Sequence, residues 1–247
     1  MKPVNLHYDA KFFDTVTEGS LRSARVIAPM LMRLLCPHSI VDIGCGRGPW
    51  LKAFQEAGVE NLTGLDGSHV DRATLLIDQL QFIPTDLSKP FIIGCNADLA
   101  LCLEVAEHLP HRMSLNLISA LTGAAPAVLF SAAIPGQGGT CHINEQWPYY
   151  WAGLFEKKNY VRIDCIRPKI AQERAVDWWY RQNMVLFVSQ EALGKSVELQ
   201  GEKQLSDELS MEFILPRVFC NYTYFSGLLR ELPIAAWRAV KKRLALR

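Results

Sequence analysis

The sequence predicts an α/β protein built on an open, mostly parallel sheet. One observation is an apolar strand, residues 40–43, that runs into three glycines at alternate positions and then into a helix beginning at Pro49. Another is the series of short apolar runs that follow, two of which lead to a carboxylate, at Asp66 and Asp86. Segments with helical spacing separate these runs, and alternation of buried strands with helices is typical of a parallel sheet.

The elements are expected in the following order. Residues 12–35 precede the sheet and have helical spacing, with breaks at Gly19 and Pro29. Strands are expected at 40–43, 61–66, 82–87, 97–103, 127–133, 160–166 and 184–190, with a helix at 110–122. Residues 194–212 are polar and charged, which predicts a loop or an exposed helix outside the core.

The loop after the first strand is suited to hold a ligand. Gly44, Gly46 and Gly48 lack Cβ, so the backbone can adopt unusual φ and ψ angles and approach a bound molecule closely. Pro49 suits the first helical position, and the start of the helix directs free N–H groups at the loop. A dinucleotide-binding loop has the pattern G-x-G-x-x-G/A, and Pro49 occupies the position of its last glycine. The spacing therefore argues against NAD.

The segment Val-Asp-Ile-Gly-Cys-Gly-Arg-Gly, with Asp42 two residues before the first glycine, closely resembles the first motif of class I S-adenosylmethionine-dependent methyltransferases. Segments 61–66, 82–87 and 97–109 resemble the family in the same order, the last ending in Glu-Val-Ala-Glu-His-Leu. The resemblance covers roughly residues 20–190. It implies a Rossmann-like fold, with a seven-stranded, mostly parallel sheet, an antiparallel last strand and helices on both faces.

The resemblance also implies which residues hold S-adenosylmethionine. It assigns the ribose hydroxyls to Asp66 and places Asp86 by the adenine amino group. The full set of implied cofactor contacts is Asp42, Gly44, Cys45, Gly46, Gly48, Asp66, Gly67, Asp86, Leu87, Leu103 and Glu104.

Methyl transfer from a sulfonium is an in-line displacement, so most of the catalysis is expected from positioning the acceptor. A hydroxyl acceptor must also lose its proton, and a general base accelerates such a step by about 10²- to 10⁴-fold. The candidate bases are His108, after the fourth strand, and His142, after the fifth, with Glu104 as a further catalytic candidate. Glu104, Glu107 and His108 also resemble a triplet that binds Mg²⁺ in some methyltransferases, with His142 as a fourth ligand, although we expect no metal.

The segment at 142–148, His-Ile-Asn-Glu-Gln-Trp-Pro, gathers hydrogen-bonding and aromatic groups in seven residues. It resembles a stretch in uncharacterised bacterial methyltransferases that are often associated with glycan or natural-product modification. The resemblance implies O-methylation of a small hydroxylated acceptor, such as a sugar, a glycan or a natural product. The side chains expected to contact this acceptor are Tyr8, His142, Asn144, Glu145, Trp147 and Trp151, with Ser20 and Ser23 as further candidates.

Composition limits the class of protein. The chain has 247 residues, 49% of them hydrophobic and 21% charged, which is enough for one sizeable α/β core. A net charge of +1 gives no global attraction for nucleic acid, so no nucleic-acid partner is expected. Seven cysteines without a C-x-x-C pair indicate a reducing compartment, and no apolar leader or 18-residue apolar run is visible. We therefore predict a cytoplasmic protein with a helical cap at 1–36, a cofactor-binding domain at 37–192 and an extension at 193–247.

Two other classes of function stay open on the sequence alone. A NAD-dependent oxidoreductase would keep the sheet and Asp66, but Pro49 and the Glu-Val-Ala-Glu-His segment oppose it. A non-catalytic S-adenosylmethionine-binding protein would keep the cofactor site and show no turnover.

The segment 228–247 differs in composition from the rest of the chain. It carries a net charge of +5 and places Ile234, Trp237, Val240 and Leu244 at helical spacing. This pattern favours a terminal helix docked on its own domain. Because a basic amphipathic helix can also lie on an anionic membrane surface, peripheral membrane contact through this segment is the second hypothesis. On the second hypothesis, deleting residues 228–247 should abolish flotation with anionic liposomes, with liposomes of neutral lipid as the control. Unchanged flotation of the deletion variant would contradict it.

Overall fold

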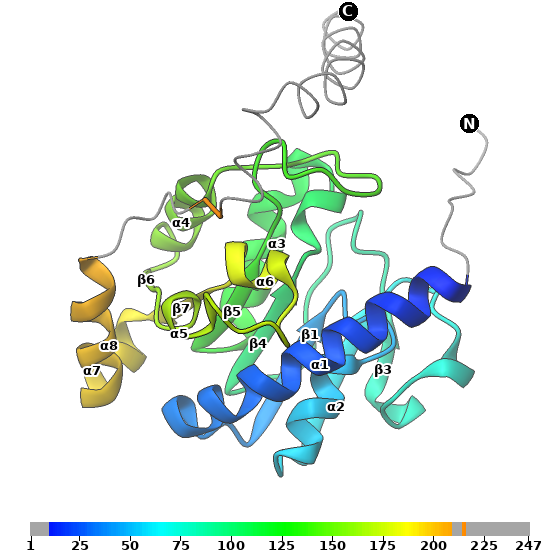
Figure 1. Cartoon of the computed structure of the whole chain (residues 1–247), viewed down its shortest axis with the longest axis horizontal. Coiled ribbons are helices and arrows are strands. Elements are labelled where there is room, and N and C mark those ends of the chain that lie inside the picture. The colour runs from blue at the N-terminus through cyan, green and yellow to red at the C-terminus, as the bar shows by residue number, and fades with distance from the viewer. Residues whose placement is uncertain (1–9, 209–213, 216–247) are drawn as a thin grey trace, which may run out of the picture. The chain divides into compact units, whose positions relative to one another are not determined.

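The structure is a computed structural model that describes residues 10–208 and 214–215 (Figure 1). The chain divides into a compact unit, residues 1–211, and a second unit, residues 212–247. Tyr8 and the basic segment 228–247 lie outside the described residues. None of the helices in the described part of the chain is long and apolar enough to cross a membrane.

The described residues form one seven-stranded sheet in the order β3-β2-β1-β4-β5-β7-β6. β1 to β5 pair in parallel, whereas β7 runs antiparallel to both of its neighbours, β5 and β6. This confirms the predicted fold class. The strands are β1 Ser39–Ile43, β2 Asn61–Asp66, β3 Phe82–Pro84, β4 Leu99–Leu103, β5 Ala127–Ser131, β6 Tyr160–Ile163 and β7 Val185–Ser189.

Helices cover both faces of the sheet, and each face has its own hydrophobic cluster. α1, α2, α5, α6 and α8 contribute to one cluster, and α3 and α4 to the other. Figure 1 shows α1 crossing beside α2 on the first face. The α-helices are α1 Ala10–Leu35, α2 Pro49–Glu56, α3 Ser114–Ala124, α4 Pro148–Glu156, α5 Arg167–Ile170, α6 Trp178–Asn183, α7 Gln190–Lys195 and α8 Val197–Asp207. The 3₁₀ turns are η1 Arg72–Thr74, η2 Gln79–Gln81, η3 Ala106–His108 and η4 His111–Met113.

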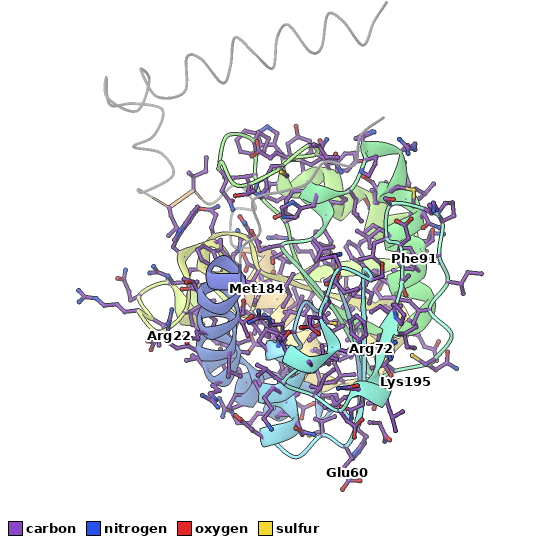
Figure 2. The ribbon with its side chains drawn as sticks, turned by 90° about the vertical axis from the view of Figure 1, so that its right-hand side faces the viewer. Arg22, Glu60, Arg72, Phe91, Met184 and Lys195 are labelled. Carbon is purple, nitrogen blue, oxygen red and sulfur yellow. The ribbon has the colours of Figure 1, made fainter. Side chains whose placement is uncertain are left out.

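β4 shows why the central strands are apolar throughout. Successive side chains of a strand point to opposite faces of the sheet, and both faces here are covered. Leu99, Leu101 and Leu103 belong to the cluster under α1, whereas Ala100 and Cys102 belong to the cluster under α3. A continuous apolar run is therefore the expected sequence of a central parallel strand. Met184, just before β7, is likewise fully buried, and Figure 2 shows it inside the unit.

The predicted breaks in the first helix are wrong, because α1 continues through both Gly19 and Pro29. At Gly19 the helix packs closely against Asp177, since a Cβ at this position would displace its carboxylate. Around Pro29, the neighbouring Ala28 and Leu31 are buried in the core, and this tertiary packing outweighs the unfavourable effect of one proline.

Two other expectations need correction. β3 has three residues rather than six, and it ends at Pro84, which has no N–H to donate to a ladder. Residues 197–207 form α8, which is a mostly exposed helix as expected, but two of its residues pack into the core. Leu199 is buried in the cluster under α1, and buried Ser206 accepts a hydrogen bond at its Oγ from Asp164 N, at 2.7 Å. Packing therefore continues past the boundary expected at residue 192.

A buried ion pair fixes α5 to the end of β6. Arg167 and Asp164 are 3% and 4% exposed, and the guanidinium Nε lies 3.0 Å from Asp164 Oδ1, while its Nη1 donates to the Gln182 carbonyl. Asp164→Asn should lower the free energy of unfolding by about 3 to 5 kcal/mol, because it removes the carboxylate charge that lies against the buried guanidinium of Arg167. Urea denaturation would measure this. Arg25→Met breaks the exposed pair with Glu56 and should have no measurable effect. The prediction would be contradicted if Asp164→Asn, like Arg25→Met, were as stable as the unaltered protein.

Candidate active site

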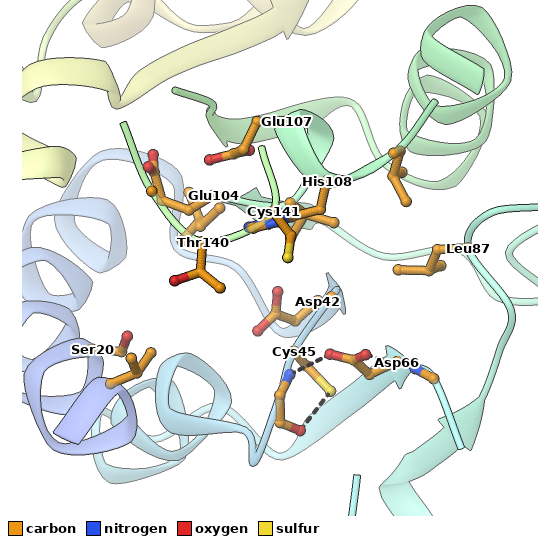
Figure 3. Close-up of a pocket in the computed structure, with 18 of the residues that line it drawn as sticks. Ser20, Asp42, Cys45, Asp66, Leu87, Glu104, Glu107, His108, Thr140 and Cys141 are labelled. Atoms are coloured by element: carbon orange, nitrogen blue, oxygen red, sulfur yellow. Dashed lines mark hydrogen bonds between the residues drawn. The ribbon is translucent and has the colours of Figure 1, made fainter. Parts of the chain in front are cut away.

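A cavity of about 1040 Å³ opens at the carboxyl ends of β1, β2 and β4. Its walls come from the glycine loop after β1, from α1, from α6 and from the loop after β5, residues 137–142. Figure 3 shows Asp42, Cys45 and Asp66 at one end of it, with Glu104, Glu107 and His108 at the other. In open α/β sheets, ligands bind outside the carboxyl ends of the strands.

The glycine loop is shaped by its neighbours in the sheet. Gly44 has φ +76°, and a Cβ there would overlap the side chain of Val105, so both conformation and space require glycine. The carboxylate of Asp66 accepts hydrogen bonds from Gly46 N at 2.7 Å and from Gly67 N at 2.6 Å (Figure 3). These bonds fix the Asp66 carboxylate between two backbone turns, with its remaining lone pairs available to a ligand.

The other two aspartates at this end differ in environment. Asp42 is 2% exposed, and burial, together with the nearby charge of Asp66, raises the pKa of its carboxyl well above the usual value. Asp86 is exposed at the edge of the cavity, where hydrogen bonds from Ser88 and Lys89 lower its pKa to about 2. Asp86 is therefore ionised throughout the physiological range.

The structure brings together the predicted cofactor contacts, with one exception. Asp42, Gly44, Cys45, Gly46, Asp66, Gly67, Asp86, Leu87, Leu103 and Glu104 all line the cavity. Gly48 does not. It has φ +80° at the N-cap of α2 and packs against Ile77, so its role is to end the loop.

Glu104 occupies a constrained position at the end of β4. Its φ is +57°, uncommon for a residue with a Cβ, and its N–H donates to the Ser131 carbonyl at 2.9 Å. Its carboxylate accepts hydrogen bonds from Asn183 Nδ2 at 3.1 Å and from Gln137 Nε2 at 3.3 Å. Burial raises the pKa of Glu104. Two distant segments of the chain therefore hold this carboxylate in one orientation.

Glu107, His108 and His142 meet at the same end of the cavity. Glu107 is fully buried; its Oε1 accepts from Ala133 N at 3.2 Å, while its Oε2 has no hydrogen-bond partner among the described residues. Burial and repulsion from Glu104 raise the pKa of Glu107 well above the usual value. The rings of His108 and His142 lie 4.9 Å apart, nearly perpendicular at 85°.

The histidines are oriented by different partners. His142 Nδ1 lies 3.2 Å from Glu145 Oε1, so the other ring nitrogen, Nε2, takes no part in this contact. His108 hydrogen-bonds with the backbone of Cys141, but burial and the neighbouring His142 lower its pKa to about 4. His108 is therefore a neutral imidazole at neutral pH, able to accept a proton.

The same three side chains have a donor set that fits a divalent cation. Ligand atoms of Glu107, His108 and His142 lie within 4.8 Å of one another, and two imidazoles with one carboxylate suit Mn²⁺ or another transition metal better than Mg²⁺. The orphaned, buried Oε2 of Glu107 and the contact between Glu145 and His142, typical of groups that orient metal ligands, are consistent with such a site.

Four of the predicted acceptor contacts do not line the cavity. Asn144 and Glu145 instead hold the loop after β5: Asn144 Nδ2 donates to the Ala106 carbonyl, and Glu145 Oε2 accepts from Gly136 N. Trp147 is the N-cap of α4, and Trp151 is 3% exposed in the core beside Phe130. Of the remaining candidates, Ser20 and His142 line the cavity, and Ser23 instead accepts from Asp177 N.

Sequence reasoning missed a different set of lining residues. These come from α1, from the loop after β5 and from α6, and they are Val16, Thr17, Gln137, Gly138, Gly139, Thr140, Cys141, Trp178, Trp179 and Tyr180. The one signal in the sequence is the Trp-Trp-Tyr run before the last strand, an unusual concentration of aromatic residues in a connector.

Comparison with known proteins defines the class. A family described as a methyltransferase domain matches residues 20–201, and the chain belongs to this family. It is an S-adenosylmethionine-dependent methyltransferase of class I, with the Rossmann-like fold, and S-adenosylmethionine is its methyl donor. The alternatives of a NAD-dependent oxidoreductase and of a non-catalytic binding protein are therefore not supported.

Solved structures share the fold at low sequence identity. The chain is similar to the mitomycin 7-O-methyltransferase MmcR (TM-score 0.53, 18% identity), covering 74% of this chain and 59% of that one. It is also similar to the methyltransferase domain of bacterial CtHen1 (TM-score 0.51, 17% identity), covering 69% of this chain and 98% of that one. A third similar structure is an O-methyltransferase family protein from Burkholderia thailandensis (TM-score 0.51, 14% identity), covering 74% of this chain and 60% of that one. No curated protein matches the chain at a significant level.

Asp66→Ala should weaken binding of S-adenosylhomocysteine by about 1 to 3 kcal/mol, because it removes a charged hydrogen-bond acceptor from the glycine-loop end of the cavity. Isothermal titration calorimetry would measure the affinity. Asp71→Ala is a matched control, since Asp71 caps the exposed turn η1 outside the cavity. Unchanged affinity in Asp66→Ala would rule out the predicted ribose contact.

Proposed function

We propose that the protein methylates a hydroxyl group of a small acceptor, with a histidine as general base. The observation that carries this proposal is the meeting of His108 and His142 at the end of the cavity remote from Asp66, beside the fixed carboxylate of Glu104. The cavity is therefore divided into a cofactor half around the glycine loop and an acceptor half around the histidines.

In the cofactor half, the proposed contacts follow the resemblance residue by residue. Asp66 accepts hydrogen bonds from the ribose hydroxyls, and Asp86 and Leu87 lie beside adenine. The two N–H groups that already orient Asp66 support this role, because they fix its carboxylate before the cofactor binds. Asp42 and Glu104 border the space between the two halves.

In the acceptor half, the chemistry is displacement at the methyl carbon. The acceptor oxygen forms a bond to this carbon as the carbon–sulfur bond breaks, and the electron pair of that bond stays on sulfur. The proton of the acceptor hydroxyl goes to His108 or His142. The neutral state of His108 supports this step. Glu107 beside it is fully buried, and groups held in a buried site are already oriented when the reaction begins.

The named structures agree with a small acceptor. MmcR is a mitomycin 7-O-methyltransferase, and the protein from Burkholderia thailandensis belongs to an O-methyltransferase family. We therefore propose a sugar, a glycan or a natural product as acceptor, and a cytoplasmic location, with peripheral membrane contact through residues 228–247 as the second hypothesis for that segment. The near-neutral charge of the chain supports the absence of a nucleic-acid partner.

Replacing the catalytic base should lower turnover without weakening cofactor binding. His108→Ala or His142→Ala is expected to reduce kcat about 10²-fold, while the affinity for S-adenosylhomocysteine changes little. If His108 is the base, kcat should fall with decreasing pH near pH 4, rather than near the usual histidine value of 6.5, because its pKa is lowered to about 4. The pH profile of methyl transfer to a responsive acceptor measures both effects.

His111→Ala is the matched control, since His111 lies against Tyr150 outside the cavity. Full activity in both the His108 and His142 variants would mean that catalysis rests on positioning alone. A parallel titration with Mn²⁺ shows whether these histidines act as a general base or as metal ligands. Manganese binding that is lost in either variant, with activity lost on chelation, would replace the general-base mechanism by metal-assisted transfer.

A further inference from the structure

α6 meets the acceptor half through Asn183, whose Nδ2 donates to Glu104, and the same helix presents an aromatic wall to the cavity. Trp178 and Trp179, the first residues of α6, line the cavity together with Tyr180. Both indoles are partly exposed, and their rings lie 5.8 Å apart at an angle of 77°. A ligand in this half therefore meets indole surfaces in two orientations.

The wall is held rigidly against α1. The hydroxyl of Tyr180 lies 2.9 Å from Ser20 Oγ and accepts a hydrogen bond from Trp50 Nε1 at 3.3 Å. At the start of α6, Asp177 Oδ1 accepts a hydrogen bond from Arg22 at 2.8 Å. α6, which carries both indoles, is therefore tied to α1 at two points before a ligand binds.

The described residues of the acceptor half include no lysine or arginine. Glu104 and Glu107 lie at its floor, and Arg47 is the one lysine or arginine among the described lining residues. Arg47 belongs to the glycine loop, in the cofactor half. An anionic group on the acceptor would therefore be buried beside two carboxyl groups without a described lysine or arginine to pair with, and burying an unpaired charge is costly.

The cavity has room for two molecules. Its volume of about 1040 Å³ is at the upper limit of cavities that hold one drug-sized ligand, so an acceptor with a single ring fits beside the cofactor.

From these contacts we infer the chemical class of the acceptor: an uncharged, hydroxylated ring, either a phenol or a neutral sugar, that packs one apolar face on Trp178 and Trp179. Phosphorylated and carboxylated analogues are disfavoured, because the described residues of the acceptor half offer no lysine or arginine to pair with their charge. Ring stacking on indole is favourable beyond the area that it buries, and it leaves the edge of the ring, with its hydroxyl, directed toward His108 and His142. This inference rests on the proposed O-methylation in the same cavity.

Two matched pairs of probes test the class of acceptor. The full-length protein with bound S-adenosylhomocysteine is titrated calorimetrically with 2-naphthol and 6-hydroxy-2-naphthoate, and with methyl β-glucoside and glucose 6-phosphate. We expect a neutral member to bind at least about tenfold more tightly than its charged partner. Binding of the naphthol identifies a phenol site, and binding of the glucoside a sugar site. A charged probe that binds as tightly as its neutral partner, or no binding of either neutral probe, overturns the inference.

Variants test the wall itself. Trp178→Leu and Trp179→Leu should each lower the affinity for the neutral probe roughly fivefold. The affinity for S-adenosylhomocysteine should stay unchanged, which reports correct folding. Trp147→Leu, outside the cavity, is the matched control and should leave both affinities unchanged. Unaltered probe binding in both α6 variants overturns the assignment of the wall. Failure of the unaltered protein to bind S-adenosylhomocysteine would instead overturn the proposed function.

Discussion

The site depends on the parallel pairing of β1 with β2 and β4. Parallel strands bring their carboxyl ends to one edge of the sheet, so Asp42, Asp66 and Glu104 meet although they are far apart in the sequence. The chain must turn sharply at this edge, and it does so with positive φ angles at Gly44 and at Glu104. The same pairing that buries the apolar faces of the strands therefore collects the polar groups of the cavity.

The acceptor half combines the turn after β4 with segments that are not part of this pairing. The loop after β5 is fixed because the Glu107 carbonyl accepts hydrogen bonds from Ile143 N and Asn144 N. α6 is fixed because Tyr180 shares its hydroxyl with α1 and α2 through Ser20 and Trp50. Buried polar groups need partners, and here those partnerships hold the walls of the cavity in position. The cofactor half is thus built mainly by the sheet and its turns, whereas the loop after β5 and α6 form the walls of the acceptor half.

This difference explains which site residues could be predicted. Each group of cofactor contacts lies within one strand and its following turn, so the local pattern of each group is visible in the sequence. The acceptor contacts come from segments far apart in the chain, and an aromatic residue at helical spacing packs equally well inward or toward a ligand. Trp151 and Trp178 look alike in the sequence, yet Trp151 is in the core beside Phe130 and Trp178 lines the cavity.

The sequence by itself determined the α/β class, the order of the strands along the chain and the glycine loop, because these follow from local periodicity and from residues that suit particular turns. Tertiary structure decided that α1 continues through Gly19 and Pro29, since packing against Asp177 and the core outweighs local preference. It also decided that Asn144 and Glu145 support a loop and that Trp178 and Trp179 face the cavity. These outcomes depend on which surfaces meet, and contacts between distant segments exist only once the chain has folded.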